Sequence, residues 1–328
     1  MLRMADDRVA QGALRTLGVV ADGLVANHGW SNEAWIGDEV VVRISPGRLT
    51  GSFAHEARVT PLVGAAGIPV PEVLGHGLVR DLGFEAAGEW IVSRRVQGIT
   101  MAAAWPSLGA GERRQVGNEL GTILSQLNSL EATIGAPRWL IESGDNLHNA
   151  YRKPTLVFAI IDAAASLPGA VSSIVAEARN FVAARYESVT AEPDVVIHGD
   201  AHGHNVMVEN GHVVALLDWE GAHHGPATIE LDMLLRYWAN ADDFPSFPGG
   251  PPTGIGPGGG LDAVDYIAET YPALFARPTL RAQLEFYDAY WQVHALLVAR
   301  HFDDAPDWQR VQRVLDGDTH LCLFERFF

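Results

Sequence analysis

The stretch between residues 195 and 220 constrains this chain more than any other part of it. Two apolar runs in this stretch are separated by a polar loop and a short turn. The first run leads to Asp200 and then, five residues later, to Asn205, and the second run leads to Asp218. We expect a strand, a loop and a second strand that bring these three oxygen-bearing side chains to one end of a small sheet.

A carboxylate base and two hard oxygen ligands in one place suit phosphoryl transfer from a nucleotide. The histidines of the same stretch leave two other interpretations open. In one, the stretch is a solvated turn with incidental histidines. In the other, a zinc ion or a metal pair supports hydrolysis, and its ligands come from His198, Asp200, His202, His204, His223 and His224. Metal-dependent hydrolysis does not account for Asn205 or for the hairpin that carries Asp218.

Composition limits the class of protein. The 328 residues are 48% hydrophobic, enough for one large domain or two lobes. The net charge of -17 argues against a nucleic-acid partner. The single cysteine, Cys322, excludes an internal disulfide and a cysteine-based zinc site. Acidic residues near the N-terminus and the lack of an apolar run of ~18 residues predict a cytoplasmic protein with no signal peptide and no membrane span.

The first 95 or so residues predict a mostly antiparallel sheet that carries one main helix. Two β-prone runs surround the turn Gly37-Asp38, and further strands are expected at 72–79 and 89–96. The main helix is expected at 52–63, with Ser52 or Thr50 as its N-cap. A shorter helix is expected near residues 5–18.

After Gly98 the pattern becomes helical. Residues 245–260 are dense in proline and glycine, and we expect either an irregular loop that serves as a lid or a disordered insertion. The helices expected from their apolar periodicity are 112–130, 170–188, 228–240, 261–272, 279–301 and 306–316.

The segment His198-Gly-Asp-Ala-His-Gly-His-Asn205, followed by Asp218, resembles the His-Gly-Asp-x-His-x-x-Asn box of the aminoglycoside phosphotransferase family in the protein-kinase-like superfamily. The resemblance covers nearly the whole chain. It implies an α+β fold with two lobes and a nucleotide between them. Residues 1–96 would form a small antiparallel N-lobe with one main helix, and residues 97–328 a larger, mostly helical C-lobe that carries the catalytic hairpin.

The resemblance also implies roles for individual residues. Asp200 would be the catalytic base that orients the acceptor hydroxyl and takes its proton. Asn205 and Asp218 would hold Mg²⁺ on the nucleotide phosphates. His198 would support the loop, and Asp232 would be a buried brace that accepts hydrogen bonds from the catalytic loop.

In the N-lobe, Arg43 stands where the family has a lysine that contacts the α- and β-phosphates and pairs with a helix glutamate, here Glu56. This is a departure, although arginine also carries charge to phosphate and forks to a carboxylate. A surface position for Arg43 and an exposed helix position for Glu56 are the alternatives.

The polar loop Asn27–Glu33 occupies the place of the nucleotide-covering loop, where Ser31 and Asn32 would offer donors to phosphate. The segment from Arg94 to Val96 would be the hinge whose backbone binds the nucleobase. Because backbone atoms would make these contacts, the sequence does not choose between ATP and GTP.

Four residues are candidates for acceptor binding, and for each a purely structural position is the alternative. Glu220 would meet a second metal or a cationic substrate, or simply lie at the surface. Tyr287 and Trp291 share one face of the 279–301 helix and would line the acceptor pocket or pack in the core. His204 would reach the acceptor cleft or pack on its own loop.

These observations predict an enzyme that moves the γ-phosphate of ATP or GTP to an acceptor hydroxyl. We expect the acceptor to be a small molecule and not a protein, because no long activation segment lies between Asp218 and the next helix. An antibiotic-inactivating kinase is the leading interpretation. A metabolic kinase of choline, homoserine or a sugar, a nucleotide-binding pseudokinase and a metal-dependent hydrolase are the alternatives. The acceptor and the oligomeric state stay open.

Overall fold

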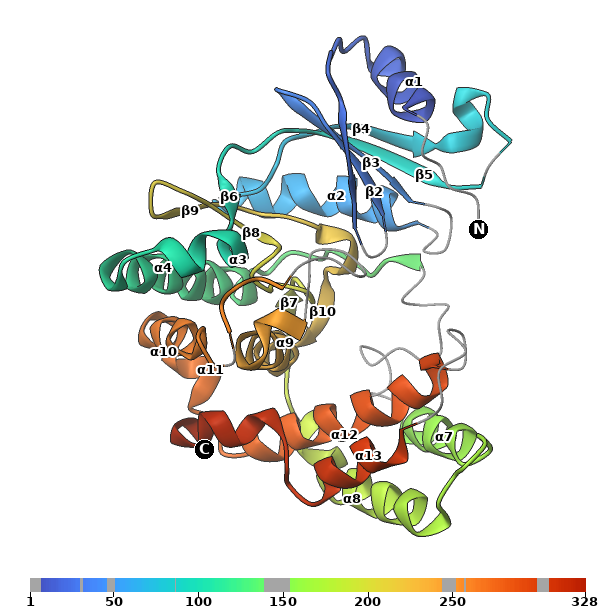
Figure 1. Ribbon diagram of the computed structural model, residues 1–328, viewed down its shortest axis with the longest axis vertical. Coiled ribbons are helices and arrows are strands. Elements are labelled where there is room, and N and C mark those ends of the chain that lie inside the picture. Colours follow the sequence, from blue (N-terminus) through green and yellow to red (C-terminus); the bar gives the residue numbers. More distant parts are fainter. Residues whose placement is uncertain are drawn as a thin grey trace.

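The computed structural model describes residues 7–29, 32–45, 51–85, 87–138, 154–243, 252–256, 258–299 and 307–328. An antiparallel sheet forms the N-terminal region, and the C-terminal region is mostly helical (Figure 1). The predicted two-lobed α+β fold is therefore confirmed. Among the described helices, none combines the length and the apolar character that a membrane span requires.

The described N-terminal residues form a five-stranded antiparallel sheet in the order β1-β2-β3-β5-β4. Its strands are β1 Val25–His28, β2 Glu33–Ile36, β3 Val40–Ser45, β4 Val73–Leu78 and β5 Glu89–Arg94. Figure 1 shows helix α1 (Arg8–Leu17) on one face of the sheet and helix α2 (Ser52–Ala65) on the other. The first face has its own apolar core, whereas Val59 and Val63 of α2 belong to the core of the helical region. Helix α2 therefore joins the two regions.

The N-terminus of α2 differs from the prediction. Its cap is Gly51, whose φ of 82° favours glycine, and Ser52 is the first helical residue. Thr50 lies outside the described residues. The side chain of Glu89 on β5 accepts hydrogen bonds from the backbone N–H groups of Gly51 and Phe53. A carboxylate from a neighbouring strand thus replaces the local cap, and a rule that considers only adjacent residues cannot find it.

The polar loop predicted at 27–33 is shorter than expected. Asn27 and His28 pair with Ala34 and Glu33 across β1 and β2. The Gly29 N–H donates to the Asn32 carbonyl at 3.0 Å, so residues on both sides of positions 30 and 31 are joined. Ser31 lies outside the described residues.

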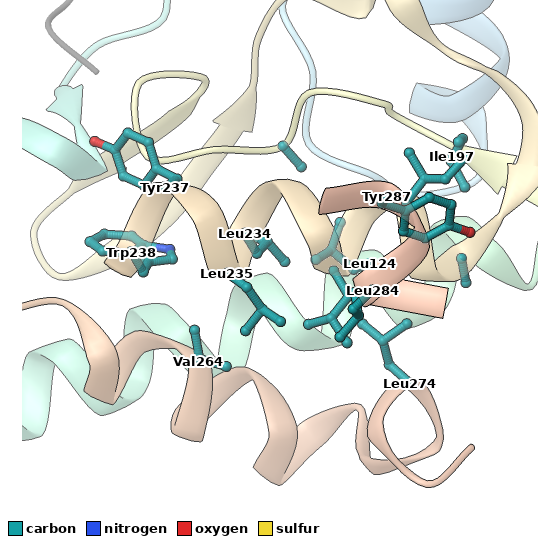
Figure 2. Close-up of a cluster of buried hydrophobic side chains, with 14 of the residues drawn as sticks. Leu124, Ile197, Leu234, Leu235, Tyr237, Trp238, Val264, Leu274, Leu284 and Tyr287 are labelled. Carbon is teal, nitrogen blue, oxygen red and sulfur yellow. The ribbon is translucent and has the colours of Figure 1, made fainter. Parts of the chain in front are cut away.

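The helical region follows the predicted pattern, with one additional long helix, α7, which begins at Pro154. The α-helices are α3 Met101–Ala104, α4 Ala110–Asn128, α7 Pro154–Ala164, α8 Ser172–Thr190, α9 Ala227–Ala239, α10 Leu261–Thr270, α11 Pro272–Phe275, α12 Leu280–Ala299 and α13 Trp308–Leu315. Short 3-10 helices are η1 Val79–Leu82, η2 Trp105–Ser107, η3 Trp219–Gly221, η4 Ala241–Asp243 and η6 His320–Phe327. Helix α9 is buried on nearly every side, and Figure 2 shows its leucines among side chains from α4, α10 and α12.

Part of the Pro/Gly segment predicted at 245–260 is fixed to η4, which follows α9. The Asp242 carboxylate accepts hydrogen bonds from the Thr253 hydroxyl at 2.6 Å and from the Gly254 N–H at 2.9 Å. Residues 244–251 and 257 lie outside the described part of the chain.

The strands that frame residues 195–220 pair differently from the prediction. The described strands form one sheet of β7 (Asp194–Ile197) with β10 (His223–Pro226), and a second of β6 (Ile99–Thr100), β8 (Val206–Glu209) and β9 (His212–Leu216). The loop after β7 therefore connects two separate sheets instead of two paired strands. The β8–β9 hairpin still places Asn205 and Asp218 at the same end, because one precedes β8 and the other follows β9.

Alanine substitutions at two glycines of α4 can test how closely this helix packs against α10. A Cβ on the buried Gly121 would lie 2.6 Å from the Ile267 carbonyl oxygen, whereas a Cβ on the exposed Gly111 would meet nothing within 4 Å. We expect Gly121→Ala to lower the free energy of unfolding by about 1–3 kcal/mol. The matched change Gly111→Ala should leave it unchanged or raise it by up to about 1 kcal/mol. Urea unfolding of both variants measures this, and equal effects would contradict the packing.

Candidate active site

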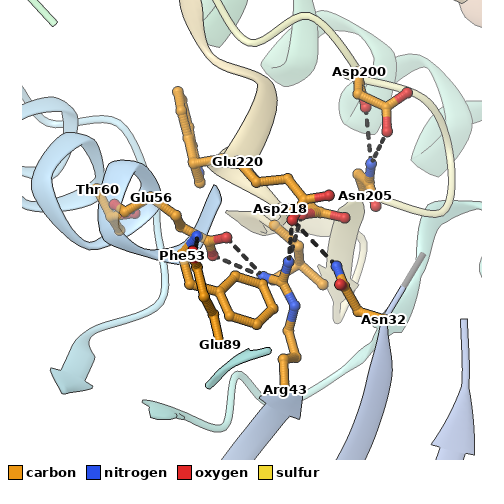
Figure 3. A network of polar contacts seen from close by, with 12 residues as sticks. Asn32, Arg43, Phe53, Glu56, Thr60, Glu89, Asp200, Asn205, Asp218 and Glu220 are labelled. Carbon is orange, nitrogen blue, oxygen red and sulfur yellow. Dashed lines mark hydrogen bonds and ion pairs between the residues drawn. The ribbon is translucent and has the colours of Figure 1, made fainter. Parts of the chain in front are cut away.

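The loop between β7 and β8 holds Asp200 against Asn205 (Figure 3). The amide nitrogen of Asn205 donates to the Asp200 backbone carbonyl at 2.9 Å and to its carboxylate at 3.0 Å. The Asn205 carbonyl accepts from the Leu217 N–H at 2.8 Å. These bonds fix the Asp200 side chain and tie the loop to the end of β9, beside Asp218.

His198 is fully buried and supports the loop, as predicted. Burial lowers the pKa of His198, which keeps the ring neutral. Its Nε2 lies 2.8 Å from the Leu217 carbonyl and its Nδ1 accepts from the Asp200 N–H at 3.3 Å. Both ring nitrogens are thus used by backbone groups, and His198 is not available as a zinc ligand.

His202 and His204 pack on helix α9. The ring of His202 stacks on Tyr237 at 5.3 Å, and the ring of His204 stands edge-on to it at 5.6 Å. Nε2 of His202 lies 3.4 Å from the Asp200 carboxylate. Burial by itself lowers the pKa of His202, but the charge and hydrogen bond of Asp200 together with the charge of Asp218 outweigh burial, and the pKa is raised. The two histidines therefore both pack on one tyrosine of α9.

The brace of the catalytic loop is Glu230 instead of Asp232. The Gly199 N–H donates to the Glu230 carboxylate, and burial raises the pKa of Glu230 to about 7. Asp232 is buried, as predicted, but it accepts from Arg236 of its own helix at 2.9 Å. Residues two apart on a helix point about 200° away from each other, so only one of the two acids faces the loop.

Arg43 lies at the centre of the polar network in Figure 3. Its Nη1 donates to both Glu56 carboxylate oxygens at 2.8 and 3.0 Å. Its Nη2 donates to Asp218 at 2.5 Å and lies 3.7 Å from Glu220. The guanidinium also covers the Phe53 ring at 4.9 Å. The predicted Arg43–Glu56 pair is confirmed, and the surface alternatives for both residues are wrong.

Three carboxylates share this one guanidinium. Ligand oxygens of Glu56, Asp218 and Glu220 all lie within 4.8 Å of one another, and this is the group of possible metal ligands found among the described residues. Burial and the neighbouring acids raise the pKa of Glu220 to about 8. Carboxylate oxygens suit a hard cation such as Mg²⁺, and the group holds no histidine or cysteine for zinc. Glu220 therefore belongs to the site and does not lie at the surface.

The remaining N-terminal candidates are Asn32, Arg94 and Val96. The Asn32 side chain donates to Glu220 at 3.2 Å, which connects the β1–β2 turn to the carboxylates. The Arg94 N–H donates to the Glu72 carbonyl at 2.8 Å and its exposed side chain pairs with the Glu72 carboxylate. The Arg94 N–H is thus used within the N-terminal region, and the half-buried Val96 follows the end of β5.

The two aromatic candidates of α12, Tyr287 and Trp291, differ in how deeply they are buried. Tyr287 is fully buried, and its hydroxyl lies 3.0 Å from the Thr228 hydroxyl. Of the two alternatives for this residue, the structure shows core packing, because the helix turns this position into the core. Trp291 is only partly buried and packs against the same core.

A contact that the sequence did not reveal fastens α2 to the segment after Asp218. His55, next to Glu56, lies with Nε2 2.6 Å from the Ala222 carbonyl. Arg58 meets the other ring nitrogen of His55 at 2.8 Å. Burial lowers the pKa of His55 to about 4, so the neutral ring donates to the carbonyl and accepts from Arg58. No sequence signal marks this pair, because its partners are 167 residues apart.

The raised pKa values of Glu220 and Glu56 predict how stability depends on pH. Each carboxyl has an ordinary value of 4.5 and a folded-state value of about 8 and about 7, respectively. The folded protein therefore binds these protons more tightly than the unfolded chain, and stability falls as pH rises from about 4.5 to 8. In metal-free buffer, Tm should fall over this range, and less steeply in Glu220→Gln.

The control is Glu131→Gln, an exposed position, which should keep the wild-type dependence. A slope in Glu220→Gln equal to that of the wild type would show that Glu220 does not titrate in this window.

Comparison with known proteins places this geometry in a family. The sequence matches the phosphotransferase enzyme family over residues 22–297. A search of the curated proteins found no match.

Solved structures share the fold at low identity. The ADP-bound aminoglycoside phosphotransferase APH(2'')-Ib matches with a TM-score of 0.66 and 12% identity, over 97% of this chain and 99% of that one. APH(4)-Ia matches with a TM-score of 0.63 and 20% identity, over 95% and 99%. APH(2'')-IIa, in a ternary complex with streptomycin and ATP, matches with a TM-score of 0.61 and 12% identity, over 99% of both chains. With its catalytic loop, its Arg43 network and its kinase-like fold, this chain belongs to the phosphotransferase enzyme family and is a phosphotransferase of the kinase type.

Proposed function

We propose that this enzyme transfers the γ-phosphate of ATP or GTP to a hydroxyl group of a small molecule, with Mg²⁺ as its cofactor. The observation that carries the proposal is the convergence of Asp200, Asn205 and Asp218 beside the Arg43–Glu56 pair. Nucleotides in the similar structures, ADP in APH(2'')-Ib and ATP in APH(2'')-IIa, support a nucleotide donor here.

Asp200 is the proposed catalytic base. Desolvation would raise the pKa of its carboxyl, but His202, His198 and the Asn205 amide outweigh desolvation and lower it. The carboxylate is therefore ionised at neutral pH, and its half-exposed side chain is open to an acceptor hydroxyl. In this role Asp200 orients the hydroxyl and takes its proton as the oxygen attacks the γ-phosphorus.

Asn205 and Asp218 are the proposed metal ligands, with Glu220 at a second position. The oxygen donors and the excess of negative charge fit a divalent cation. When bound, Mg²⁺ would neutralise charge on the phosphates. Arg43 would carry further positive charge to the phosphates, and Glu56 would hold its guanidinium in place.

A small-molecule acceptor is supported by the short connection between Asp218 and α9, which holds only η3 and β10. Hygromycin B and gentamicin are bound in structures of APH(4)-Ia and APH(2'')-IIa, and we propose an antibiotic acceptor on this likeness. His204, Glu220 and Trp291 are the proposed acceptor contacts. We also propose that the lobes meet at residues 96 and 97, and that the enzyme works in the cytoplasm, where nucleotides are supplied.

The acceptor class has a direct test in cells. A host that expresses the protein should tolerate at least one antibiotic of an aminoglycoside panel better than the same host with Asp200→Ala. If hosts that express the wild type and Asp200→Ala grew equally on every antibiotic, the proposed resistance function would be refuted. Phosphorylation of choline, homoserine or a sugar by the purified enzyme would then assign a metabolic kinase.

The role of Asp200 predicts the loss of turnover on substitution. Asp200→Ala should lower kcat by about 10²–10⁴-fold, because the hydroxyl loses its base and its orientation. Asp200→Asn should keep the loop fold and lose activity similarly. Asp162→Asn, at an exposed position of α7, is the matched control and should retain full activity.

Mass spectrometry of candidate acceptors with ATP and with GTP provides the measurement, since each transfer adds one phosphoryl group. Turnover that survives in Asp200→Ala would refute the proposed mechanism. Wild-type protein that binds nucleotide but phosphorylates no acceptor would favour the pseudokinase.

A further inference from the structure

The carboxylate of Asp200 needs more than one contact to keep a single orientation. The terminal torsion of an aspartate has a broad energy minimum, so the plane of the carboxylate turns easily about the Cβ–Cγ bond. Asn205 donates to one oxygen, Oδ2, at 3.0 Å (Figure 3). This bond fixes one oxygen, whereas a base that orients a hydroxyl works best with its whole carboxylate in a fixed plane.

His202 offers a second donor, on the other side of the carboxylate. Its Nε2 lies 3.4 Å from Oδ1 of Asp200, which is long for an N–H···O bond, as catalytic hydrogen bonds often are before the substrates bind. Burial raises the pKa of Asp200, and the charge and hydrogen bond of His202 are the first of the interactions that outweigh burial and lower it. The two oxygens of the carboxylate thus meet two different donors.

The backbone of the loop decides which nitrogen of His202 carries the hydrogen. The His204 N–H donates to Nδ1 of His202 at 3.2 Å, so Nδ1 presents its lone pair. The hydrogen of the neutral ring is therefore on Nε2, toward Asp200. A charged ring also carries a hydrogen on Nε2, so this donor does not depend on the titration of His202.

The ring of His202 is held in place by groups other than Asp200. It stacks on Tyr237 with 5.3 Å between the ring centroids and 13° between the planes, and Tyr237 is fully buried on α9. The backbone beside it approaches the same tyrosine, because a Cβ on Gly203 would lie 2.6 Å from the Tyr237 ring. The Gly203 carbonyl accepts from the Ala102 N–H of α3 at 2.9 Å. The donor is therefore in place before the substrates bind.

These contacts leave Asp200 able to act on an acceptor. The Asp200 side chain is 42% exposed and that of His202 is 18% exposed. A carboxylate oxygen has two lone pairs, so Oδ1 can accept from His202 and from a hydroxyl at the same time. His202 itself has one nitrogen occupied by a backbone N–H and a hydrogen on the other, so it acts through Asp200 and not as a base of its own.

We propose that His202 is the positioning residue of the catalytic base, and that its Nε2–H holds Oδ1 of Asp200 while Asn205 holds Oδ2. The carboxylate then meets the acceptor hydroxyl in one orientation. This inference rests on the proposed function of Asp200 as the base. The alternative is a His202 that only supports the fold of the loop through its contact with Tyr237.

NMR of the ¹⁵N-labelled protein tests the geometry without a nucleotide, a metal or an acceptor. Long-range correlations between the nitrogens and the carbon-bound hydrogens of each histidine ring show which nitrogen is protonated. The spectrum is recorded at alkaline pH, where the ring is neutral, and His202→Gln assigns the signals of His202 by their loss. We expect the hydrogen on Nε2, and a hydrogen on Nδ1 would overturn the proposal.

Substitutions separate positioning of Asp200 from support of the fold. His202→Leu keeps an apolar side chain on Tyr237 but loses the donor. It should lower kcat by about 10–100-fold and leave KM for ATP unchanged, because the carboxylate loses its orientation. His202→Gln carries an amide N–H that can reach the same oxygen, and it should recover most of the lost kcat. In an Asp200→Asn background, His202→Leu should cause no further loss.

Turnover is measured as ADP release from ATP and Mg²⁺, with water alone and with each antibiotic of the aminoglycoside panel as the acceptor. His76→Leu, at an exposed position of β4, is the matched control and should keep the full kcat. Turnover of His202→Leu equal to that of the wild type, or an equal loss in His202→Gln, would overturn this inference and leave Asp200 as the base. Wild-type protein without turnover that depends on Asp200 would refute the proposed function and this inference with it.

Discussion

The site depends on the ion pairs that the guanidinium group of Arg43 forms with Glu56 and Asp218. The guanidinium joins Glu56 on α2 to Asp218 after β9 and so connects the sheet region to the helical region. A planar fork with separate nitrogens can bind two carboxylates at once, which a single ammonium does with less geometric control. An arginine at this position therefore suits a site that holds three acids around one cation.

The catalytic loop is positioned by backbone contacts to buried groups. Glu230 binds the Gly199 N–H, His198 bridges to the Leu217 carbonyl, and Asn205 holds Asp200 from the other side. Each of these groups is partly or fully desolvated, so its hydrogen bonds are strong and their loss is costly. The loop therefore presents one fixed carboxylate, as catalysis by orientation requires.

The similar structures share the fold at 12–20% identity. Such a likeness shows the fold alone, and it does not identify the acceptor, which depends on individual side chains. In this chain, a cavity lies between α9, α12 and α13, and the Asp242 carboxylate holds Thr253 and Gly254 of the Pro/Gly segment.

The sequence by itself determined the fold class, most helices and strands, and the set of Asp200, Asn205 and Asp218, because these depend on periodicity and on spacing within one short stretch. The Arg43–Glu56 pair was also predicted, through resemblance. Only the tertiary structure decided that Glu230 and not Asp232 braces the loop, that Glu89 caps α2, that Tyr287 is buried, and that His55 fastens α2 to Ala222. Each of these outcomes depends on which faces of distant segments meet, and local sequence carries no record of that.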